Sequence, residues 1–244
     1  MAGTRVPMGV LGKFQELAGA IGFWNAILCS TSRLSSKLGN NRVRIVKYYF
    51  TAQPVSAFDG VRPTRSGSFD FTWADINCEL LQQADRPPAV LASRFAQGAR
   101  CLVAAKQNEL AGFVWFVTGA YEEDEVRARF VPGPEGKAAW DFDVTIIPQY
   151  RMGRLFSYLW GRTNAELARC GVRHTMSRIS AFNPGSLASH KRLGADIVGS
   201  AIFVCVGRLQ VMRSSMRPRW HISWRDEQRP TLVVAATSTG AMRS

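Results

Sequence analysis

Three consecutive stretches decide the fold: AWDFDVTII (139–147), RLFSYLWGRTNAELARC (154–170) and HTMSRIS (174–180). The first alternates aromatic or aliphatic with acidic or polar side chains up to Pro148, which is typical of a strand. The second repeats large apolar residues at three- and four-residue steps and ends before Gly171, which predicts a long helix. The third is again strand-like. The centre of the chain is therefore predicted to run strand, helix, strand.

The flanking sequence extends this pattern in both directions. Upstream, apolar runs at Val43–Val55, Cys101–Ala105 and Leu110–Thr118 predict strands, the last two at hairpin spacing. Downstream, Asn183-Pro184 opens a helix that ends near Gly194, and Ile197–Val206 reads as a final strand. The predicted fold class is α/β, with a mixed, mostly antiparallel central sheet flanked by helices.

The organisation along the chain divides into three parts. Residues 1–40 form an N-terminal amphipathic helical segment, 41–206 the main domain, and 207–244 a basic, partly irregular C-terminal extension. The apolar residues of 8–38 lie on one helical face. That face predicts either packing against the main domain or a peripheral contact with a membrane.

The net charge of +13 is concentrated at the two ends of the chain. Residues 1–66 hold nine Lys or Arg and two Asp or Glu, residues 205–244 hold seven and two, and the middle is nearly neutral. This balance favours a polyanionic partner, such as an acidic acyl-carrier protein, a phosphorylated cofactor or an anionic membrane surface. We do not expect nucleic acid as a partner, because the sequence has no zinc-finger spacing, no basic zipper and no RNP-type aromatic motif.

Several other classes of protein are excluded by the sequence. No apolar run approaches the roughly 20 residues of a spanning helix. The five cysteines are scattered, without metal-binding spacing, which predicts neither a disulfide framework nor a metal site. We therefore expect a cytoplasmic protein, with peripheral membrane contact left open.

The segment IIPQYRMGR (146–154) leads from the predicted strand into the long helix. A basic turn at a helix N-terminus offers amide N–H groups and positive charge to a phosphate. The segment resembles the cofactor-binding turn of the GNAT superfamily of acyl-CoA-dependent N-acyltransferases. By this resemblance, the cofactor-binding residues include Arg151, Met152, Gly153 and Arg154. The sequence departs from the family pattern in having Leu155 and Phe156 where a small residue is expected.

A second segment, NPGSLASHKRLGA (183–195), resembles the family's Asn-x-x-Ala-x-x-x-Tyr-x-x-x-Gly-Phe motif. The resemblance implies that Asn183 reaches the pantetheine arm, with Ser186 beside it. His190 stands in place of the tyrosine that acts as general acid near the leaving thiolate. An imidazole is able to donate a proton near neutral pH. The alternative is that His190 is a structural helix residue.

The strand 139–147 supplies the third element of the resemblance. In the family, the corresponding strand splays from its parallel neighbour, and its free amides bind the thioester carbonyl. That role falls here to the backbone of Thr145, Ile146 and Ile147, which would stabilise the oxyanion. Candidate bases for the amine proton are Asp143 and Glu123, with Asp141, Asp124 and Glu125 as further candidates.

These observations predict an N-acyltransferase that uses acetyl-CoA or a longer acyl-CoA as co-substrate. The acyl group would pass to a small-molecule amine or a protein amine by direct attack, without a metal. One alternative is a long-chain acyltransferase similar to N-acyl amino acid synthases that takes its donor from an acyl-carrier protein. Another is a non-catalytic, acyl-CoA-binding or membrane-associated member of the superfamily.

Overall fold

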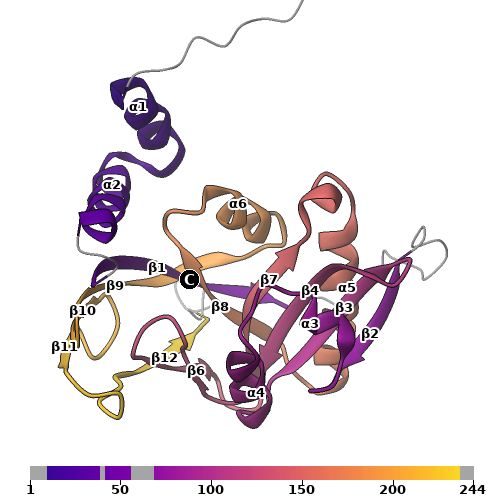
Figure 1. Cartoon of the computed structure of the whole chain (residues 1–244). Coiled ribbons are helices and arrows are strands. Elements are labelled where there is room, and N and C mark those ends of the chain that lie inside the picture. The colour runs from indigo at the N-terminus through magenta and orange to yellow at the C-terminus, as the bar shows by residue number, and fades with distance from the viewer. Residues whose placement is uncertain (1–9, 39–41, 56–68, 237–244) are drawn as a thin grey trace, which may run out of the picture.

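The computed structural model describes residues 10–38, 42–55 and 69–236 of the chain. The ends of the expected N-terminal segment and C-terminal extension, 1–9 and 237–244, therefore lie outside the described residues. A nine-stranded sheet forms the centre of the molecule (Figure 1). Its order is β11 (Trp220–Ser223), β10 (Leu209–Ser214), β9 (Asp196–Val206), β1 (Val43–Pro54), β8 (His174–Ser180), β7 (Ala138–Ile146), β4 (Glu109–Val117), β3 (Arg100–Lys106), β2 (Asp70–Ala74).

Only the pair β7–β8 is parallel among the neighbours in this sheet, and the other pairs are antiparallel. The predicted fold class, a mixed and mostly antiparallel sheet flanked by helices, is confirmed. The sequence did not predict that β1 enters the sheet between β8 and β9. It pairs antiparallel with both strands, and Tyr48 and Phe50 on it are fully buried.

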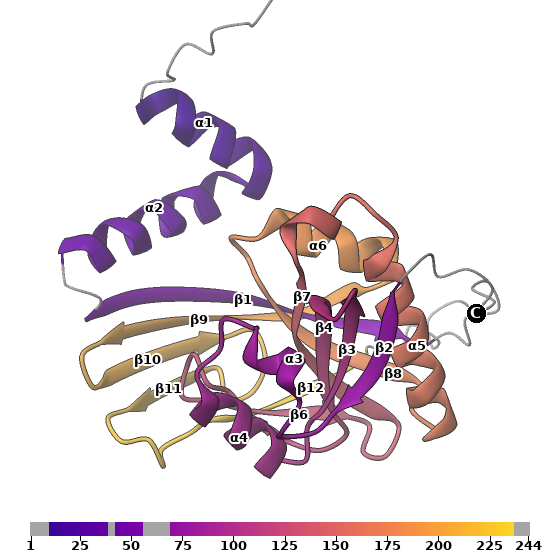
Figure 2. The ribbon, with the colours of Figure 1, turned by 45° about the vertical axis from the view of Figure 1, so that its right-hand side comes forward.

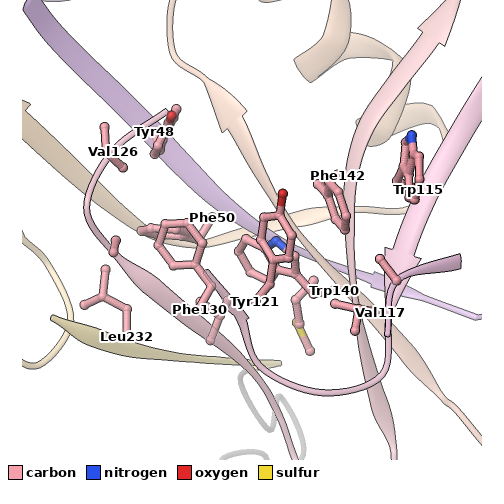
Figure 3. Close-up of a cluster of buried hydrophobic side chains, with 14 of the residues drawn as sticks. Tyr48, Phe50, Trp115, Val117, Tyr121, Val126, Phe130, Trp140, Phe142 and Leu232 are labelled. Carbon is pink, nitrogen blue, oxygen red and sulfur yellow. The ribbon is translucent and has the colours of Figure 1, made fainter. Parts of the chain in front are cut away.

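One side of the large sheet, here the core face, carries Trp140 and Phe142 of β7. A second sheet covers part of it, in the order β12 (Thr231–Ala235), β6 (Arg129–Gly133), β5 (Tyr121–Glu122). Figure 3 shows the aromatic core between the two sheets. In this core the ring of Phe130 stacks on Trp140, with 4.8 Å between centroids. This arrangement buries large apolar area and holds β7 rigidly at its base.

The sheet pairing corrects one expectation from the sequence and adds detail to another. The expected continuation of the β-meander at 126–131 is instead β6, which lies in the other sheet. The extension from residue 207, expected to be partly irregular, contains β10, β11 and β12 in its described part, so it contributes to both sheets. Its strands are only six, four and five residues long, which leaves little of the alternation that marks a strand in sequence.

The opposite side of the sheet, here the helix face, carries Asp141 of β7 and is covered by α5 (Leu155–Arg169) and α6 (Pro184–Arg192). Gly171 and Gly194 follow these helices with φ of +76° and +83°, which confirms both predicted helix ends. Two short helices, α3 (Glu79–Gln82) and α4 (Pro88–Ala96), lie on the core-face side of β3 and β4. A 3₁₀ turn, η1 (Pro148–Tyr150), joins β7 to α5.

The N-terminal segment forms two helices, α1 (Val10–Ile21) and α2 (Phe23–Leu38), rather than the single helix expected. The break falls at Gly22, whose φ is +83°. α1 stands off the body, while α2 lies against β1 (Figure 2). Ser32 Oγ donates to the carbonyl oxygen of Ile45 at 2.9 Å, so α2 covers backbone that β8 leaves unpaired. No described helix has both the length and the hydropathy to cross a bilayer.

Candidate active site

The two parallel strands β7 and β8 part from each other halfway along their length. Their pairing runs from Ala138 opposite His174 to Asp141 opposite Ser177 and then stops. Both strands continue, to Ile146 and to Ser180 respectively. Beyond Asp141 the edge of β7 that faces β8 therefore has no strand partner, and this divergence of the two strands is here called the opening. This is the splayed pair that the sequence resemblance implied.

A β-bulge shapes β7 where the strands separate. Trp115 and Phe113 of β4 face Phe142 and Thr145, so one residue of β4 opposes two of β7, Asp143 and Val144. Asp143 has a φ of +47°, which is unusual for a non-glycine residue. The extra residue reverses the alternation of side chains beyond it.

The bulge and the pairing with β4 decide which amides face the opening. The N–H of Ile147 donates to the carbonyl oxygen of Ala111 at 2.9 Å, so residue 147 is hydrogen-bonded to β4. Because bonded and non-bonded pairs alternate in an antiparallel ladder, Thr145 also bonds β4, and Ile146 turns its N–H and C=O to the other edge. Arg151 Nε donates to the Ile146 carbonyl from that side at 3.0 Å. Of the three residues expected to offer a free N–H, only Ile146 directs it toward the opening. The expectation for Thr145 and Ile147 was wrong, because their N–H groups bond to β4.

The turn after β7 places exposed basic residues at the start of α5. Arg151, Met152, Gly153 and Arg154 are all exposed. Arg154 occupies the N-cap position of α5, and no side chain caps the helix there. Neither arginine forms an ion pair with a described residue. The turn thus has the positive charge and helix N-terminus expected of a phosphate-binding segment.

Asn183 and Ser186 meet at the start of α6, as their spacing predicts. Asn183 Oδ1 accepts a hydrogen bond from the Ser186 N–H at 3.0 Å. Asn183 is therefore the N-cap of α6, and Ser186 contributes its backbone to that cap. Capping occupies the side-chain oxygen of Asn183. The predicted contact of these residues with a pantetheine arm remains a prediction.

His190 is buried between α6 and α5, with only 4% of its surface exposed. Its ring contacts Trp160 and Phe156 edge-on, at centroid distances of 5.6 and 6.1 Å. Burial lowers the pKa of His190 to about 4. The imidazole is therefore neutral at physiological pH, which argues for the structural alternative rather than for a general acid. Phe156, one of the bulky residues that depart from the family pattern, makes part of this contact.

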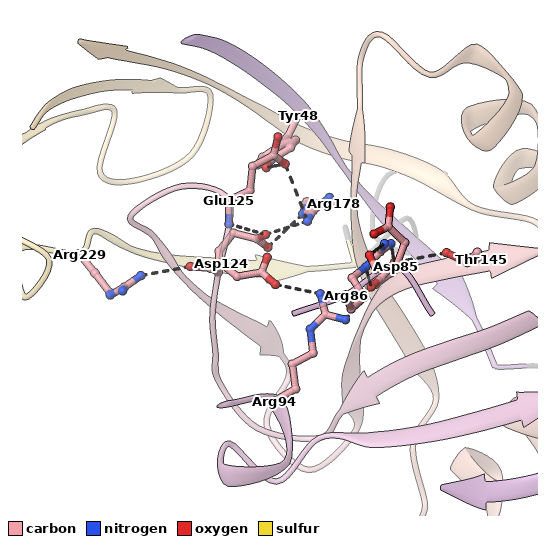
Figure 4. A network of polar contacts seen from close by, with 11 residues as sticks. Tyr48, Asp85, Arg86, Arg94, Asp124, Glu125, Thr145, Arg178 and Arg229 are labelled. Carbon is pink, nitrogen blue, oxygen red and sulfur yellow. Dashed lines mark hydrogen bonds and ion pairs between the residues drawn. The ribbon is translucent and has the colours of Figure 1, made fainter. Parts of the chain in front are cut away.

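Four of the five candidate bases lie in a network of ion pairs on the core face (Figure 4): Asp143, Glu123, Asp124 and Glu125. Asp143 accepts hydrogen bonds from Arg86 Nη2 at 2.6 Å and from Arg94 Nη1 at 2.5 Å. Burial alone would raise the pKa of Asp143, but these two guanidinium groups outweigh it and lower the pKa below the usual value. Asp143 is consequently a fixed anion rather than a free base.

Glu123 is the second candidate base, and its side chain is fully buried. Arg178 of β8 binds both of its carboxylate oxygens, at 2.7 and 3.0 Å. Burial raises the pKa of Glu123, and the charge of Arg178 offsets part of that effect. The neighbouring Asp124 pairs with Arg94 at 2.8 Å, and Glu125 accepts a hydrogen bond from Tyr48. The network joins the diverging halves of β7 and β8, through Asp143 on one and Arg178 on the other.

Two arginines in this network, Arg94 and Arg178, did not stand out in the sequence. Arg94 is 4% exposed and stacks over Trp115 and Phe142. For Arg94, the available signal was a charged residue within the run 88–96, whose other residues are apolar apart from Ser93. Buried arginine is rare unless it is paired, so such a position points to a nearby carboxylate.

Asp141, the remaining candidate on β7, lies on the helix face and apart from the network. Ser177 Oγ donates to Asp141 Oδ2 at 2.6 Å, and both residues are buried. Burial raises the pKa of Asp141 to about 7, although the hydrogen bond from Ser177 by itself would lower it. In the described residues, no group of three His, Cys, Asp or Glu side chains is positioned to hold a metal ion.

Comparison with solved structures returns matches of fold at low identity. A protein of unknown function from Staphylococcus epidermidis aligns with a TM-score of 0.48 and 12% identity, over 71% of this chain and 66% of its own. A GNAT-family protein from Novosphingobium aromaticivorans gives 0.43 and 17%, over 65% and 63%. A tandem GNAT protein from the clavulanic acid biosynthesis pathway gives 0.47 and 11%, over 74% and 58%.

GNAT proteins are among the structures that this chain resembles. The match is one of fold alone, and it spans less than two thirds of each of those three chains. No protein-family model matches the sequence. No curated protein matches it either.

Proposed function

We propose that the protein is an N-acyltransferase that transfers an acyl group from a coenzyme A thioester to an amine. The observation that supports this most directly is the opening between β7 and β8, along which Ile146 presents its free amide. A donor N–H held rigidly in a strand stabilises the negative charge that develops on a thioester carbonyl when an amine attacks. The bulge at Asp143 fixes the position of that donor.

The donor would bind with its pyrophosphate at the turn before α5. Arg151 and Arg154 supply positive charge there, beside the uncapped N-terminus of the helix. The residues of this turn fit a phosphate group. The space between α5 and α6 fits less well, because the rings of Phe156, Trp160 and His190 pack there. The acyl-bearing arm would therefore lie closer to β7 than to α6.

In the reaction, the neutral amine attacks the thioester carbonyl, a C–N bond forms, and the C–S bond breaks to release the thiolate. The amine proton passes to solvent, because Asp143 and Glu123 are both held in ion pairs. We expect the rate to follow the neutral fraction of the amine rather than the titration of either carboxylate. The ion-pair network then positions β7 and β8 and takes no proton itself.

The proposal also includes a class of acyl donor and a class of acceptor. Acetyl-CoA or a longer acyl-CoA is the donor, and a small-molecule or protein amine is the acceptor. The net charge of +13 also supports an acyl group delivered by an acidic carrier protein. A series of donors of increasing chain length, on coenzyme A and on a carrier protein, separates these possibilities.

A second candidate is a protein that binds acyl thioesters without catalysis. The buried, neutral His190 favours it, since the position that resembles the family's general acid holds no acid at neutral pH. The two candidates differ in turnover and share the donor site.

The experiment is calorimetric titration with acetyl-CoA and longer acyl-CoAs, followed by detection of free thiol in the presence of a panel of amines. Arg151→Glu with Arg154→Glu should weaken donor binding at least tenfold. Lys137→Glu with Arg173→Glu, in exposed turns before β7 and β8, makes the same change of charge and should leave affinity nearly unchanged. Binding without thiol release would favour the non-catalytic candidate. Absence of binding to every thioester would contradict both candidate functions.

A further inference from the structure

The helix face of β9, β10 and β11 is apolar and exposed. Val204, Val211 and Ile222 are neighbours in register across the three strands and form a row on this face. Trp220 lies in the next row, and Trp224 follows the end of β11. Ile222, Trp224 and Trp220 are 52%, 56% and 63% exposed. Scattered exposed apolar residues are common, but a contiguous row flanked by two tryptophans marks an interaction surface.

The chain around this face is strongly basic. Residues 207–225 contain five arginines, at positions 208, 213, 217, 219 and 225, and no acidic residue. None of the five forms an ion pair with a residue in the described part of the chain. Arg213 lies over the ring of Trp220, with 5.4 Å from its guanidinium carbon to the ring centroid. The apolar row is therefore bordered by cations without a counterion from the protein.

We propose that this face, the docking face of β9–β11, binds the surface of a bilayer that contains anionic phospholipids. Exposed tryptophans partition to the headgroup region of membranes, and arginines pair with lipid phosphates and carboxylates. The valine and isoleucine row reaches the start of the acyl chains. This inference is independent of the proposed acyl transfer.

The charge pattern selects a lipid surface over other occupants. In a two-fold dimer through this face, the five arginines would face the same five arginines across the interface, which is repulsive. A nucleic acid would pair with the arginines but leave the aliphatic row without a partner. An anionic bilayer provides phosphate groups for the arginines and an apolar interior for the aliphatic row.

The test is co-sedimentation of the full chain with vesicles of phosphatidylcholine alone and of phosphatidylcholine mixed with phosphatidylglycerol. We expect binding to the anionic vesicles only, decreasing as salt is raised. Arg217→Glu with Arg219→Glu should weaken the partition coefficient by about tenfold or more. Trp220→Ala with Trp224→Ala should also weaken it several-fold. All variants are checked by circular dichroism, and both pairs lie in exposed positions.

The control is again Lys137→Glu with Arg173→Glu, which alters net charge equally at a distant site and should retain most of the binding. Three results would overturn the proposal. The first is no binding to anionic vesicles. The second is an equal loss in the control, which would indicate non-specific attraction to a basic protein. The third is a dimer in light scattering that the tryptophan substitutions dissociate, which would make this face a contact between two copies.

Discussion

The imidazole of His190 packs edge-on against the indole of Trp160, with 5.6 Å between the ring centroids. This contact joins α6 to α5 at the place where the sequence resemblance implied a general acid. Since the ring is buried and neutral, its main contribution is to packing between the two helices.

His190→Phe should change the free energy of unfolding by less than about 1.5 kcal/mol, because it exchanges one buried ring for another of similar volume. Acyl transfer at neutral pH should stay within a few-fold of the original rate. Thiol-release kinetics and urea denaturation test both points. A general acid contributes about 10²–10⁴ in rate, so a loss of that size with unchanged stability would return His190 to a catalytic role.

Gly112 of β4 is in close contact with the β7 backbone. A Cβ placed on it would lie 2.7 Å from the Thr145 carbonyl oxygen and 2.9 Å from Ile146 Cδ1. Gly112→Ala should therefore destabilise the fold by about 1–3 kcal/mol and shift the amide of Ile146, lowering turnover. Gly119→Ala is the matched control, because a Cβ there meets nothing within 4 Å. Equal effects of the two substitutions would contradict the proposed geometry.

Asp143→Asn removes the carboxylate that Arg86 and Arg94 share. Because Arg94 is buried, its charge would be left partly uncompensated, and we expect a loss of about 3–5 kcal/mol. Glu166→Gln breaks the more exposed pair with Arg100 and should cost about 1 kcal/mol or less. Denaturation curves at neutral pH give both values. A small loss for Asp143→Asn would mean that the network is dispensable for stability.

Asn183 is expected to act first as a helix cap. Asn183→Ala should cost about 1 kcal/mol, and Asn183→Ser should restore most of that, since serine caps equally well. If the amide also contacts the donor, Asn183→Ser should recover stability without recovering donor affinity. Calorimetric titration of both variants with an acyl-CoA separates the cap from the contact.

Asp141 makes stability depend on pH in an unusual direction. Its folded pKa of about 7 lies above the unfolded value, so the folded state holds the proton more tightly. The stability that it contributes is complete below the unfolded pKa and is lost as pH rises toward 7, with a limiting slope of about 1.4 kcal/mol per pH unit. His190, with a folded pKa of about 4, acts oppositely, because its contribution is lost as pH falls below 6.5 toward 4.

Asp141→Asn isolates the contribution of this carboxyl. The stability of the variant relative to the original protein should be lowest below pH 4 and should rise steadily from about pH 4 to pH 7, because asparagine stays neutral. Urea denaturation across that range is the measurement. Parallel curves for the two proteins at all pH values would show that Asp141 does not titrate with a raised pKa.

Local pattern was sufficient to predict several parts of the structure. The strand at 139–147, the helix ends at Gly171 and Gly194, and the cap at Asn183 each depend on residues close together in sequence. Side-chain alternation, left-handed glycine and side-chain capping are local effects, so the sequence by itself determined them. It also determined the mixed, mostly antiparallel sheet, because the order of strands and helices restricts the choice of architecture.

Other features were decided only by the tertiary structure. Alternation along β7 places Asp141 and Asp143 on one face, but the bulge sends Asp143 to Arg94 on the core face and leaves Asp141 with Ser177 on the other. The insertion of β1 beside β8 depends equally on a distant strand. Pairing register and a positive φ at Asp143 arise from contacts with β4 rather than from neighbouring residues. Whether a carboxylate is free or paired therefore follows from the packing of strands that the local sequence does not encode.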